Sequence, residues 1–363
     1  MAQGDPREFP TEAFTLLAGC GFLTLPLSRE LGGIGLGRDA GTAGALTELL
    51  AIVGWGDLSL ARVYEGHLNA LLLIQQFGDA DQIQRAAGDA ERGLVFGVWN
   101  TEGGDGLRII LNGNGLLLEG RKTFASGAGS IKRPLVTARD DAGGWQLIQL
   151  DMERATSSVD RGSWETFGMR GSHSFAIDLS GARIQSRQLI GQDGDYYRQP
   201  WFSGGAIRFC AAQLGGAAAL LDLARDELTA RGRAGDPLQR ERIGTMSSAL
   251  ASGFAMLETA ASLADRSQFG GGPCTDDDRL LAYVGLTRTT VERVCLEIIE
   301  TVEQSLGATS LMTTHPAARI GADLRLYLRQ PAPDAVLLGA ADYLLGAQEP
   351  YMHIWNDARG SGQ

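Results

Sequence analysis

The chain has 363 residues, of which 44% are apolar and 21% are charged, and its formal net charge is −11 at pH 7. This composition excludes a disordered chain, and the length exceeds what one hydrophobic core usually supports, which predicts two or three structural units. The acidic balance argues against a nucleic-acid partner or an anionic membrane surface, because both need a basic face. A local basic patch could still bind a phosphate group.

The four cysteines are far apart and form no C-x-x-C pair, so neither a zinc site nor a disulfide framework is indicated. We expect four buried thiols in a reduced, cytoplasmic protein. The first residues show no signal-peptide pattern, and no window approaches the ~18 uninterrupted apolar residues of a membrane span. The four histidines never fall in an H-x-x-x-H arrangement, so no metal site is predicted. The cysteines are Cys20, Cys210, Cys274 and Cys295.

Residues 1–92 are predicted to form an N-terminal helical domain. Apolar residues recur there at helical spacing, as in Phe14, Leu17 and Ala18. The glycine-rich stretch LGGIGLG at 31–37 interrupts the pattern. Several short helices are therefore expected.

Residues 93–197 are predicted to form an antiparallel β-domain. LLLEGRKTF at 116–124 and PLVTAR at 134–139 are bounded by glycine-rich turns, and WQLIQLDM follows as a hairpin partner. SFAIDL at 174–179 places Phe175, Ile177 and Leu179 on one face of a strand. The pattern indicates a small sheet or barrel.

Residues 198–363 are predicted to form a C-terminal helical bundle. Long amphipathic helices are expected over 236–265, with Pro237 near the start, and over 280–306, with Gly307 as the stop. SQFGGGPCTDDD at 267–278 is predicted to link them. Small residues such as Gly253 and Ala260 allow close helix packing, as in a four-helix bundle.

Three stretches of the β-region carry the candidate chemistry. WNTEGGD at 99–105 places a hydroxyl and two acids beside glycines, TFASG at 123–127 ends a strand with an aromatic residue and a serine, and FGMRGS at 167–172 surrounds an arginine with glycines. Glycine lets a backbone approach a flat ligand closely. From spacing alone, turn chemistry explains all three stretches equally well.

The motifs occur in a specific order that resembles the acyl-CoA dehydrogenase superfamily. LGGIGLG is followed by NTE with GGD, by KTFASG, by ETFGMRGS, and by a strand and LIGQDGD before the helical C-terminal half. The resemblance covers residues 10–345. It implies an α+β multidomain fold in which an N-terminal helical domain precedes a β-domain and a C-terminal four-helix bundle.

The resemblance also implies a bound FAD. Its ring would be contacted along the pyrimidine edge by Trp99, Asn100 and Thr101. Its face near N5 would be covered by Phe124, Ala125 and Ser126. A serine hydroxyl near N5 stabilises electron density that arrives there.

More distant residues are assigned by the same resemblance. Arg231 resembles the arginine that reaches the flavin pyrophosphate, often that of a neighbouring subunit. Gln304 and Gly307 resemble the segment that contacts the adenosine half across a dimer, so we expect a homodimer or homotetramer. Arg170 resembles a buried structural arginine that ties the sheet to the bundle.

The chain departs from the family pattern at two places. Glu102 runs directly into Gly103 and Gly104, without the loop that helps to hold pantetheine, which puts a CoA substrate in doubt. The usual glutamate base would fall at Gln330 or Pro331, and its other location corresponds to 204–207, which has no acid. Asp334 is the nearest carboxylate and is a weak candidate for the base.

Three functions stay open for the chain. The leading expectation is an FAD-dependent dehydrogenase that oxidises an acyl thioester-like substrate by hydride transfer to N5, with an electron-transfer partner. The first alternative is a two-component monooxygenase that takes reduced FMN or FAD from a partner reductase, although the histidine usual in that branch would also fall near Gln330. The second alternative is an inactive relative of the fold.

The stretch HPAARIGADLRLYLRQPAPD at 315–334 is predicted to be the helix that should deliver the base. Asp323 and Arg325 are interpreted as a packing ion pair on this helix. His315 starts the helix, too far from the expected site to act there.

Overall fold

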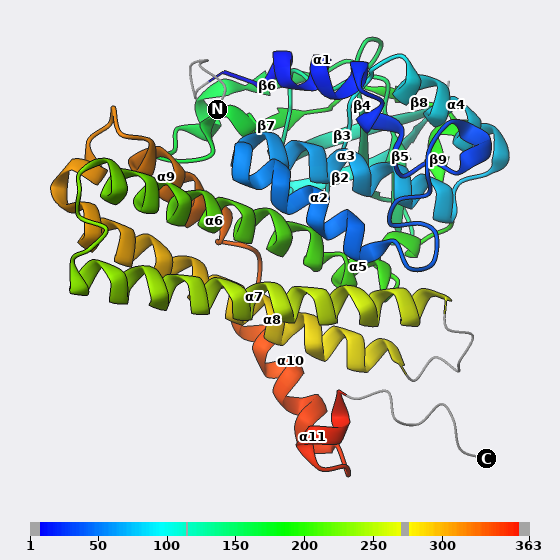
Figure 1. Ribbon diagram of the computed structural model, residues 1–363. Helices are drawn as coiled ribbons and strands as arrows, with labels where there is room; N and C mark the ends of the chain where they lie inside the picture. The colour runs from blue at the N-terminus through cyan, green and yellow to red at the C-terminus, as the bar shows by residue number, and fades with distance from the viewer. Residues whose placement is uncertain (1–7, 114, 270–275, 356–363) are drawn as a thin grey trace.

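A computed structural model describes residues 8–113, 115–269 and 276–355 of the chain. Its elements follow the predicted order of helices, sheet and helices (Figure 1). Residues 270–275 of the predicted linker at 267–278, including Cys274, lie outside the described residues, and the rest of the linker belongs to two helices.

The N-terminal region contains four α-helices, and capping side chains fix the starts of the third and fourth. Asp57 accepts a hydrogen bond from the backbone N–H of Leu60 at 2.8 Å, and Asp79 and Gln82 form a capping box. Such caps satisfy N–H groups that a helix leaves without partners. The helices are α1 (Thr11–Gly19), α2 (Ala43–Gly56), α3 (Leu58–Phe77) and α4 (Ala80–Glu91).

The middle region forms one sheet of nine strands in the described part of the chain, with the main order β6-β7-β3-β2-β4-β5-β9. Most pairs are antiparallel, as predicted, and β4 and β5 form the expected hairpin. Two pairings with β4 are parallel, those of β1 and β2. The strands are β1 (Phe96–Trp99), β2 (Glu102–Asn112), β3 (Gly115–Ala125), β4 (Arg133–Arg139), β5 (Trp145–Gln149), β6 (Ser158–Asp160), β7 (Phe175–Asp178), β8 (Arg183–Ile184) and β9 (Leu189–Ile190).

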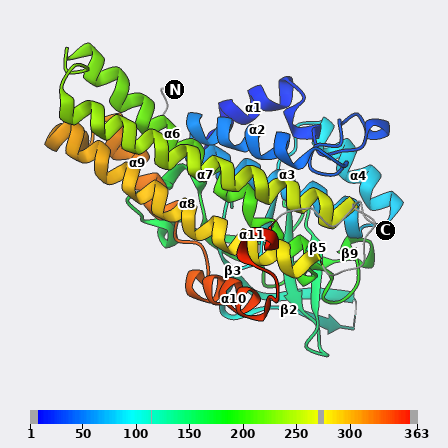
Figure 2. The ribbon, with the colours of Figure 1, turned by 60° about the horizontal axis from the view of Figure 1, so that its bottom comes forward.

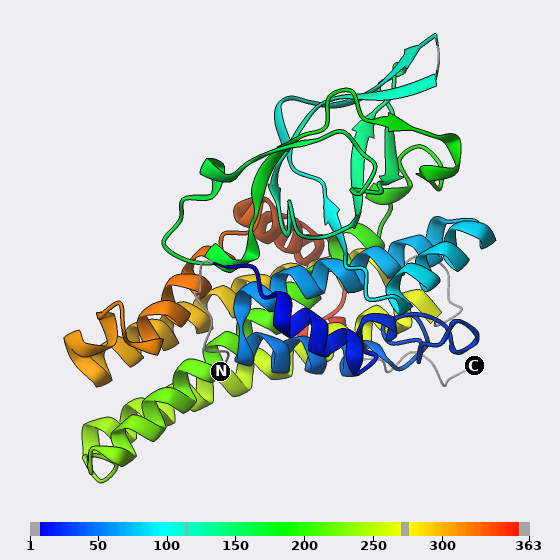
Figure 3. The same cartoon turned by 90° about the horizontal axis from the view of Figure 1, so that it is seen from above.

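The C-terminal region is helical to its described end. The second long helix stops at Gly307, whose φ of +70° is left-handed and suits glycine, as the sequence predicted. Figures 2 and 3 place α10 on the side of α8 that faces the sheet. The helices are α5 (Trp201–Gly204), α6 (Ala206–Ala230), α7 (Pro237–Phe269), α8 (Asp276–Leu306), α9 (Pro316–Tyr327), α10 (Pro333–Gly346) and α11 (Tyr351–Ile354).

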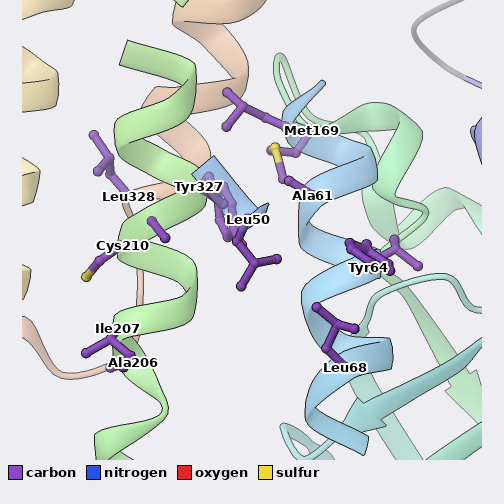
Figure 4. Packing of buried hydrophobic residues seen from close by; sticks show 14 of the residues in the cluster. Leu50, Ala61, Tyr64, Leu68, Met169, Ala206, Ile207, Cys210, Tyr327 and Leu328 are labelled. Carbon is purple, nitrogen blue, oxygen red and sulfur yellow. The ribbon is translucent and has the colours of Figure 1, made fainter. Parts of the chain in front are cut away.

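Helix α3 joins the two halves of the molecule, because it contacts both β1 and α6 (Figures 1 and 3). In Figure 4, the buried residues Leu50 and Tyr327 lie between α3 and α6, whereas Cys210 points from α6 away from α3. A single cluster of buried apolar residues therefore runs from the N-terminal helices through the sheet into the bundle. The relative positions of sheet and bundle are fixed by this shared core.

Helices α2 and α6 approach closely enough to touch through their backbones. A Cβ added to Gly54 would lie 2.2 Å from the carbonyl oxygen of Ala212, and one added to Gly215 would lie 2.0 Å from that of Ala51. Gly253 of α7 also faces α6, against Leu214. Small residues therefore set helix spacing in the bundle, as predicted, and extend this close packing to an N-terminal helix.

Residues Trp201–Ala230 form the one described helical stretch that is long and apolar enough to cross a membrane. Within its most apolar window, 67% is buried inside the protein. A core helix of a soluble protein has this character.

The expectation of four buried thiols is wrong for Cys20, which is exposed at the end of α1. Cys210 and Cys295 are buried, and burial raises the pKa of the Cys210 thiol to about 12. These two thiols are therefore inert packing groups at neutral pH.

Candidate functional site

A cavity of about 720 Å³ lies between the sheet and the helices. This volume falls within the range of small-molecule sites. We call one side the sheet wall, formed by Val98, Asn100, Thr101 and Phe124. The opposite side, the helical wall, is formed by residues of α3, α5, α6, α8 and α10 and of the loop between α9 and α10.

Asn100 is held in the sheet wall by its oxygen atoms. Its Oδ1 accepts hydrogen bonds from Thr137 Oγ1 at 2.9 Å and from the Tyr197 hydroxyl at 2.7 Å. Within the described chain, these bonds leave the two N–H donors of the same amide for a ligand. Thr101 is exposed beside it, so its hydroxyl adds a further polar group to this wall.

Lys122 supports Asn100 from behind. It is fully buried, pairs with Glu102, and donates to the backbone oxygen of Asn100 at 3.1 Å and to Thr137 Oγ1 at 3.0 Å. Burial lowers the pKa of the Lys122 ammonium. Glu102 is thus a structural partner of a buried lysine, and it does not line the cavity.

Phe124 presents an aromatic ring to the cavity because the backbone is strained there. The pairing of β3 with β7 shifts register between Lys122 and Ala125, and Phe124 takes a left-handed φ of +51°. Its side chain is 60% exposed and contacts the edge of Trp164 at a centroid distance of 5.9 Å. A flat ring in the cavity would therefore find an aromatic surface at this point.

Three of the predicted ring-binding residues lie beneath the sheet wall. Trp99 and Ala125 are buried, and Trp99 Nε1 donates to the backbone oxygen of Ser126 at 2.9 Å. The Ser126 hydroxyl is buried and 2.9 Å from Ser174 Oγ, which is 2.8 Å from Ser172 Oγ. Asn100, Thr101 and Phe124 thus line the cavity, whereas the other three support the wall.

The helical wall contains a buried ion cluster that sequence reasoning missed. Glu65 of α3 is 6% exposed and pairs with Arg62 and with Arg208 of α6, each at 2.9 Å. The only sequence signal was an Arg-x-x-Glu pair in a helix that is otherwise largely apolar. Two guanidinium groups therefore surround this buried carboxylate.

The position expected for a base carries no acid. Gln330 and Pro331 line the cavity, and Gln330 Nε2 donates to the backbone oxygen of Tyr327 at 2.7 Å. Asp334 is exposed in the first turn of α10 and is absent from the lining, although Ala335 beside it is present. At the other location, Gly205 and Ala206 line the cavity.

Other proton-transfer groups are sparse in the described lining. Its carboxylates are Glu65 and Asp278, and it contains neither histidine nor cysteine. Burial raises the pKa of the Tyr196 hydroxyl far above neutrality, so this residue stays protonated. The cavity is better suited to binding and orienting a ligand than to abstracting a proton.

The predicted ion pair on α9 is wrong. Asp323 and Arg325 form no ion pair, because residues two apart on a helix point in different directions. Asp323 instead accepts a hydrogen bond from the backbone N–H of Met169 at 2.5 Å, and Arg325 pairs with Glu303 at 3.1 Å. Burial raises the pKa of Asp323 to about 6.

Arg170 is exposed, so the predicted buried arginine is also wrong. The neighbouring backbone makes the connection between sheet and bundle instead, since a Cβ at Gly168 would lie 2.1 Å from the carbonyl oxygen of Ala322. His315 caps α9 through its Nδ1 and lies 3.0 Å from Glu227, away from the cavity as expected.

Arg231, Gln304 and Gly307 lie far from the cavity in this chain. Ala206 lines the cavity at the start of α6, and Arg231 caps the other end of the same helix. A rise of 1.5 Å per residue separates these ends by roughly 36 Å. Arg231 pairs there with Glu227, and Gln304 Nε2 donates to Glu300 at 3.2 Å.

A second cavity of about 510 Å³ adjoins the first. The two share Asn69, Gly205 and Arg208, and the second is also lined by Gln268 and Phe269 at the end of α7. Sequence reasoning treated these α7 residues as part of a linker. The shared residues show that the two cavities meet beside the start of α6.

The fold, the strained aromatic residue and the polar sheet wall define a protein of the acyl-CoA dehydrogenase-like fold, as the ordered motifs predicted. No protein-family model matches the chain. Among curated proteins it is similar to isobutyryl-CoA dehydrogenase of Dictyostelium discoideum, with 24% identity over 91% of this chain and 80% of that protein. It is also similar to L-evernosamine nitrososynthase of a Micromonospora species, with 26% identity over 93% of this chain and 83% of that protein.

Solved structures share the fold over nearly the whole chain. TdsC from Paenibacillus sp. A11-2, in complex with FMN and indole, has a TM-score of 0.84 and 19% identity, and the match covers 96% of this chain and 94% of TdsC. KijD3, in complex with FMN and a dTDP-linked amino-keto sugar, has a TM-score of 0.81 and 22% identity over 96% of this chain and 90% of KijD3. The chain is therefore related to flavin-dependent oxidoreductases of this fold.

Proposed function

We propose that the chain is a flavin-dependent monooxygenase that binds flavin against the sheet wall and a small-molecule substrate against the helical wall. One observation carries the proposal: Gln330 and Pro331 line the cavity where a dehydrogenase would need its base. Dehydrogenation of an acyl group requires a base that removes a carbon-bound proton. Oxygenation by reduced flavin involves no such removal, so at Gln330 the monooxygenase loses only the histidine that is usual in its branch.

The residues of the sheet wall fit a flavin ring. The Asn100 amide and the Thr101 hydroxyl offer hydrogen bonds to a polar ring edge, and Phe124 offers an aromatic surface. A bound reduced flavin supplies the electrons for the reaction with oxygen. Lys122 keeps Asn100 in place, and apolar residues of α8 and α10 line the opposite side.

Solved structures of the same fold also support a monooxygenase. TdsC is a dibenzothiophene monooxygenase, and MsuC from Pseudomonas fluorescens, with a TM-score of 0.83, is a methanesulfinate monooxygenase. TdsC and KijD3 are both seen with FMN. We therefore favour reduced FMN, supplied by a separate reductase, over the FAD expected from the sequence.

Residues at the far end of the bundle distinguish the two flavins. FAD has an adenosine half that FMN lacks, and Arg231, Gln304 and Gly307 would serve it only in a homodimer or homotetramer, since Arg231 lies roughly 36 Å from its own cavity along α6. FMN would need none of these residues. A strong preference for FAD in solution would favour the oligomeric assignment.

A dehydrogenase acting on an acyl thioester is the second candidate, because the isobutyryl-CoA dehydrogenase of D. discoideum matches 91% of the chain. Its base would be Asp334, brought inward by movement of the turn at 331–333. In that case Asp334→Asn would abolish reduction of the flavin by substrate, and Asp342→Asn, an exposed change on the same helix, would not.

Flavin binding and anaerobic reduction test the proposal together. The chain is expected to bind reduced FMN and to show no bleaching of the visible flavin band when isobutyryl-CoA is added to FAD-loaded protein without oxygen. Bleaching that depends on Asp334 would overturn the oxygenase in favour of the dehydrogenase. A chain that binds neither FMN nor FAD, oxidised or reduced, would exclude both.

A further inference from the structure

Arg288 differs from the other arginines of the cavity because it makes no close ion pair. Arg62 and Arg208 share Glu65. Arg288 of α8 also lines the cavity, but among the described residues no carboxylate pairs with it directly. Glu292 of the same helix acts on its charge from a distance and pairs with Arg329 instead, so the helical wall contains one cation without an ion pair of its own.

The position of Arg288 is fixed while most of its donors stay available. Its guanidinium lies over the ring of Phe209 at 5.3 Å, and Nη2 donates to the backbone oxygen of Pro331 at 2.9 Å. A guanidinium has five N–H donors in a planar fork, and the described chain uses one of them. Stacking and a single hydrogen bond thus orient the guanidinium, while its other N–H donors have no acceptor in the described chain.

The charge of Arg288 carries a free-energy cost because the side chain is partly removed from water. The side chain is half-buried, and burial lowers the pKa of the guanidinium. Arginine nevertheless keeps its charge in proteins, so the penalty for removing it from water persists until an anion arrives. An anion that binds bidentately would offset this penalty.

The charge of the cavity is opposite in sign to that of the whole chain. Three arginines and two carboxylates line it, which gives a local charge of +1, whereas the chain carries −11. Gly285 and Val336, beside Arg288, are apolar. The helical wall thus combines an unpaired cation with an apolar surface.

We propose that the substrate of this cavity is a small apolar molecule with an anionic head, a carboxylate or similar oxyanion, and that Arg288 binds this head. The inference rests on the proposed function, which places the substrate against the helical wall. It makes Arg288 a specificity-determining residue. A flavin phosphate has the same chemistry and is the other possible source of the anion, so the experiment separates the two.

The test uses isothermal titration calorimetry with three carboxylates and their neutral carboxamides: benzoate, phenylacetate and indole-3-carboxylate. Each pair has nearly the same shape and differs in charge. Wild-type protein loaded with FMN is compared with Arg288→Gln. Arg293→Gln, an exposed change on the same helix and outside the cavity, is the matched control.

Wild type is expected to bind at least one carboxylate about tenfold more tightly than its carboxamide, because hydrogen bonds to charged groups contribute roughly 1.5–3 kcal/mol. Arg288→Gln should lose this preference while binding the carboxamide as before, and Arg293→Gln should keep it. Wild type that prefers no carboxylate, or that binds none, would overturn the inference. So would a preference that survives in Arg288→Gln.

Flavin titrations form the second arm. If Arg288→Gln weakens binding of FMN but not of riboflavin, which has no phosphate, the cation serves the flavin and the inference is wrong. The carboxylate titrations are repeated on flavin-free protein. A chain that binds no flavin but keeps the Arg288-dependent preference would contradict the proposed function and retain this inference.

Discussion

The two walls of the cavity are built in different ways. The sheet wall consists of neutral polar and aromatic groups that come from two short stretches, at 98–101 and at Phe124. The helical wall carries the charges, and its ion cluster joins Glu65 to Arg208, 143 residues away in the chain. The first wall is a local feature of the sequence, and the second exists only when distant helices meet.

This difference assigns different tasks to the walls. Neutral donors and a ring surface recognise a flat cofactor with little dependence on charge. A wall with three arginines and few groups able to take up a proton selects a ligand by its charge. In the proposed function, the cofactor side is therefore the part that short stretches of sequence predict, and the substrate side is the part that depends on contacts between distant helices.

The largest expected effect comes from removing the carboxylate of the helical wall. Glu65→Ala leaves Arg62 and Arg208 as uncompensated charges beside the core, and it should lower the free energy of unfolding by about 3–5 kcal/mol. Urea denaturation measures the loss. Glu12→Ala, on the exposed side of α1, should change stability by less than about 0.5 kcal/mol. A similarly small effect at Glu65 would mean that solvent, rather than Glu65, compensates the arginines.

The second effect concerns Asp323, which holds the segment between β6 and β7 against α9. Its pKa is raised from 3.8 to about 6 by burial, so the unfolded chain releases this proton at lower pH than the folded one. Stability from this group is fully present below pH 3.8 and is lost as the pH rises through about 6. The unfolding free energy of wild type relative to Asp323→Asn should fall by about 3 kcal/mol between pH 3.5 and pH 7.

Denaturation of both proteins across this pH range provides the check. Asp342→Asn, exposed on α10, should show no such trend relative to wild type. A difference that rises with pH would mean that Arg319 stabilises the ionised carboxylate of Asp323 more than burial penalises it.

The smallest effect is expected at the sheet wall. Thr101→Val removes one hydroxyl from the proposed flavin edge and should weaken FMN binding by about tenfold, equivalent to roughly 1.4 kcal/mol. Folding stability should hardly change, because the side chain is exposed. Fluorescence titration measures the affinity, with Thr15→Val on α1 as the control. Unchanged FMN affinity would remove Thr101 from the cofactor site.

Much of the fold could be predicted because it depends on short-range patterns. Period-two alternation identified the strand with Phe175 and Ile177, and Gly307 identified the end of α8. Errors arose where a side chain's partner lies far away in the sequence. Arg170 proved exposed and Asp323 bonds to Met169, because neither orientation is encoded within its own helix or turn.

The sequence by itself determined the order of helices and sheet, the superfamily resemblance and the polar stretch of the sheet wall, since each depends on neighbours along the chain. Only the tertiary structure decided which charged groups meet. Arg62, Glu65, Arg208 and Arg288 come from three helices, and helical periodicity does not reveal which helix faces which. Close packing of α3, α6 and α8 brings these residues to one cavity, where Arg288 makes no direct ion pair with any described residue.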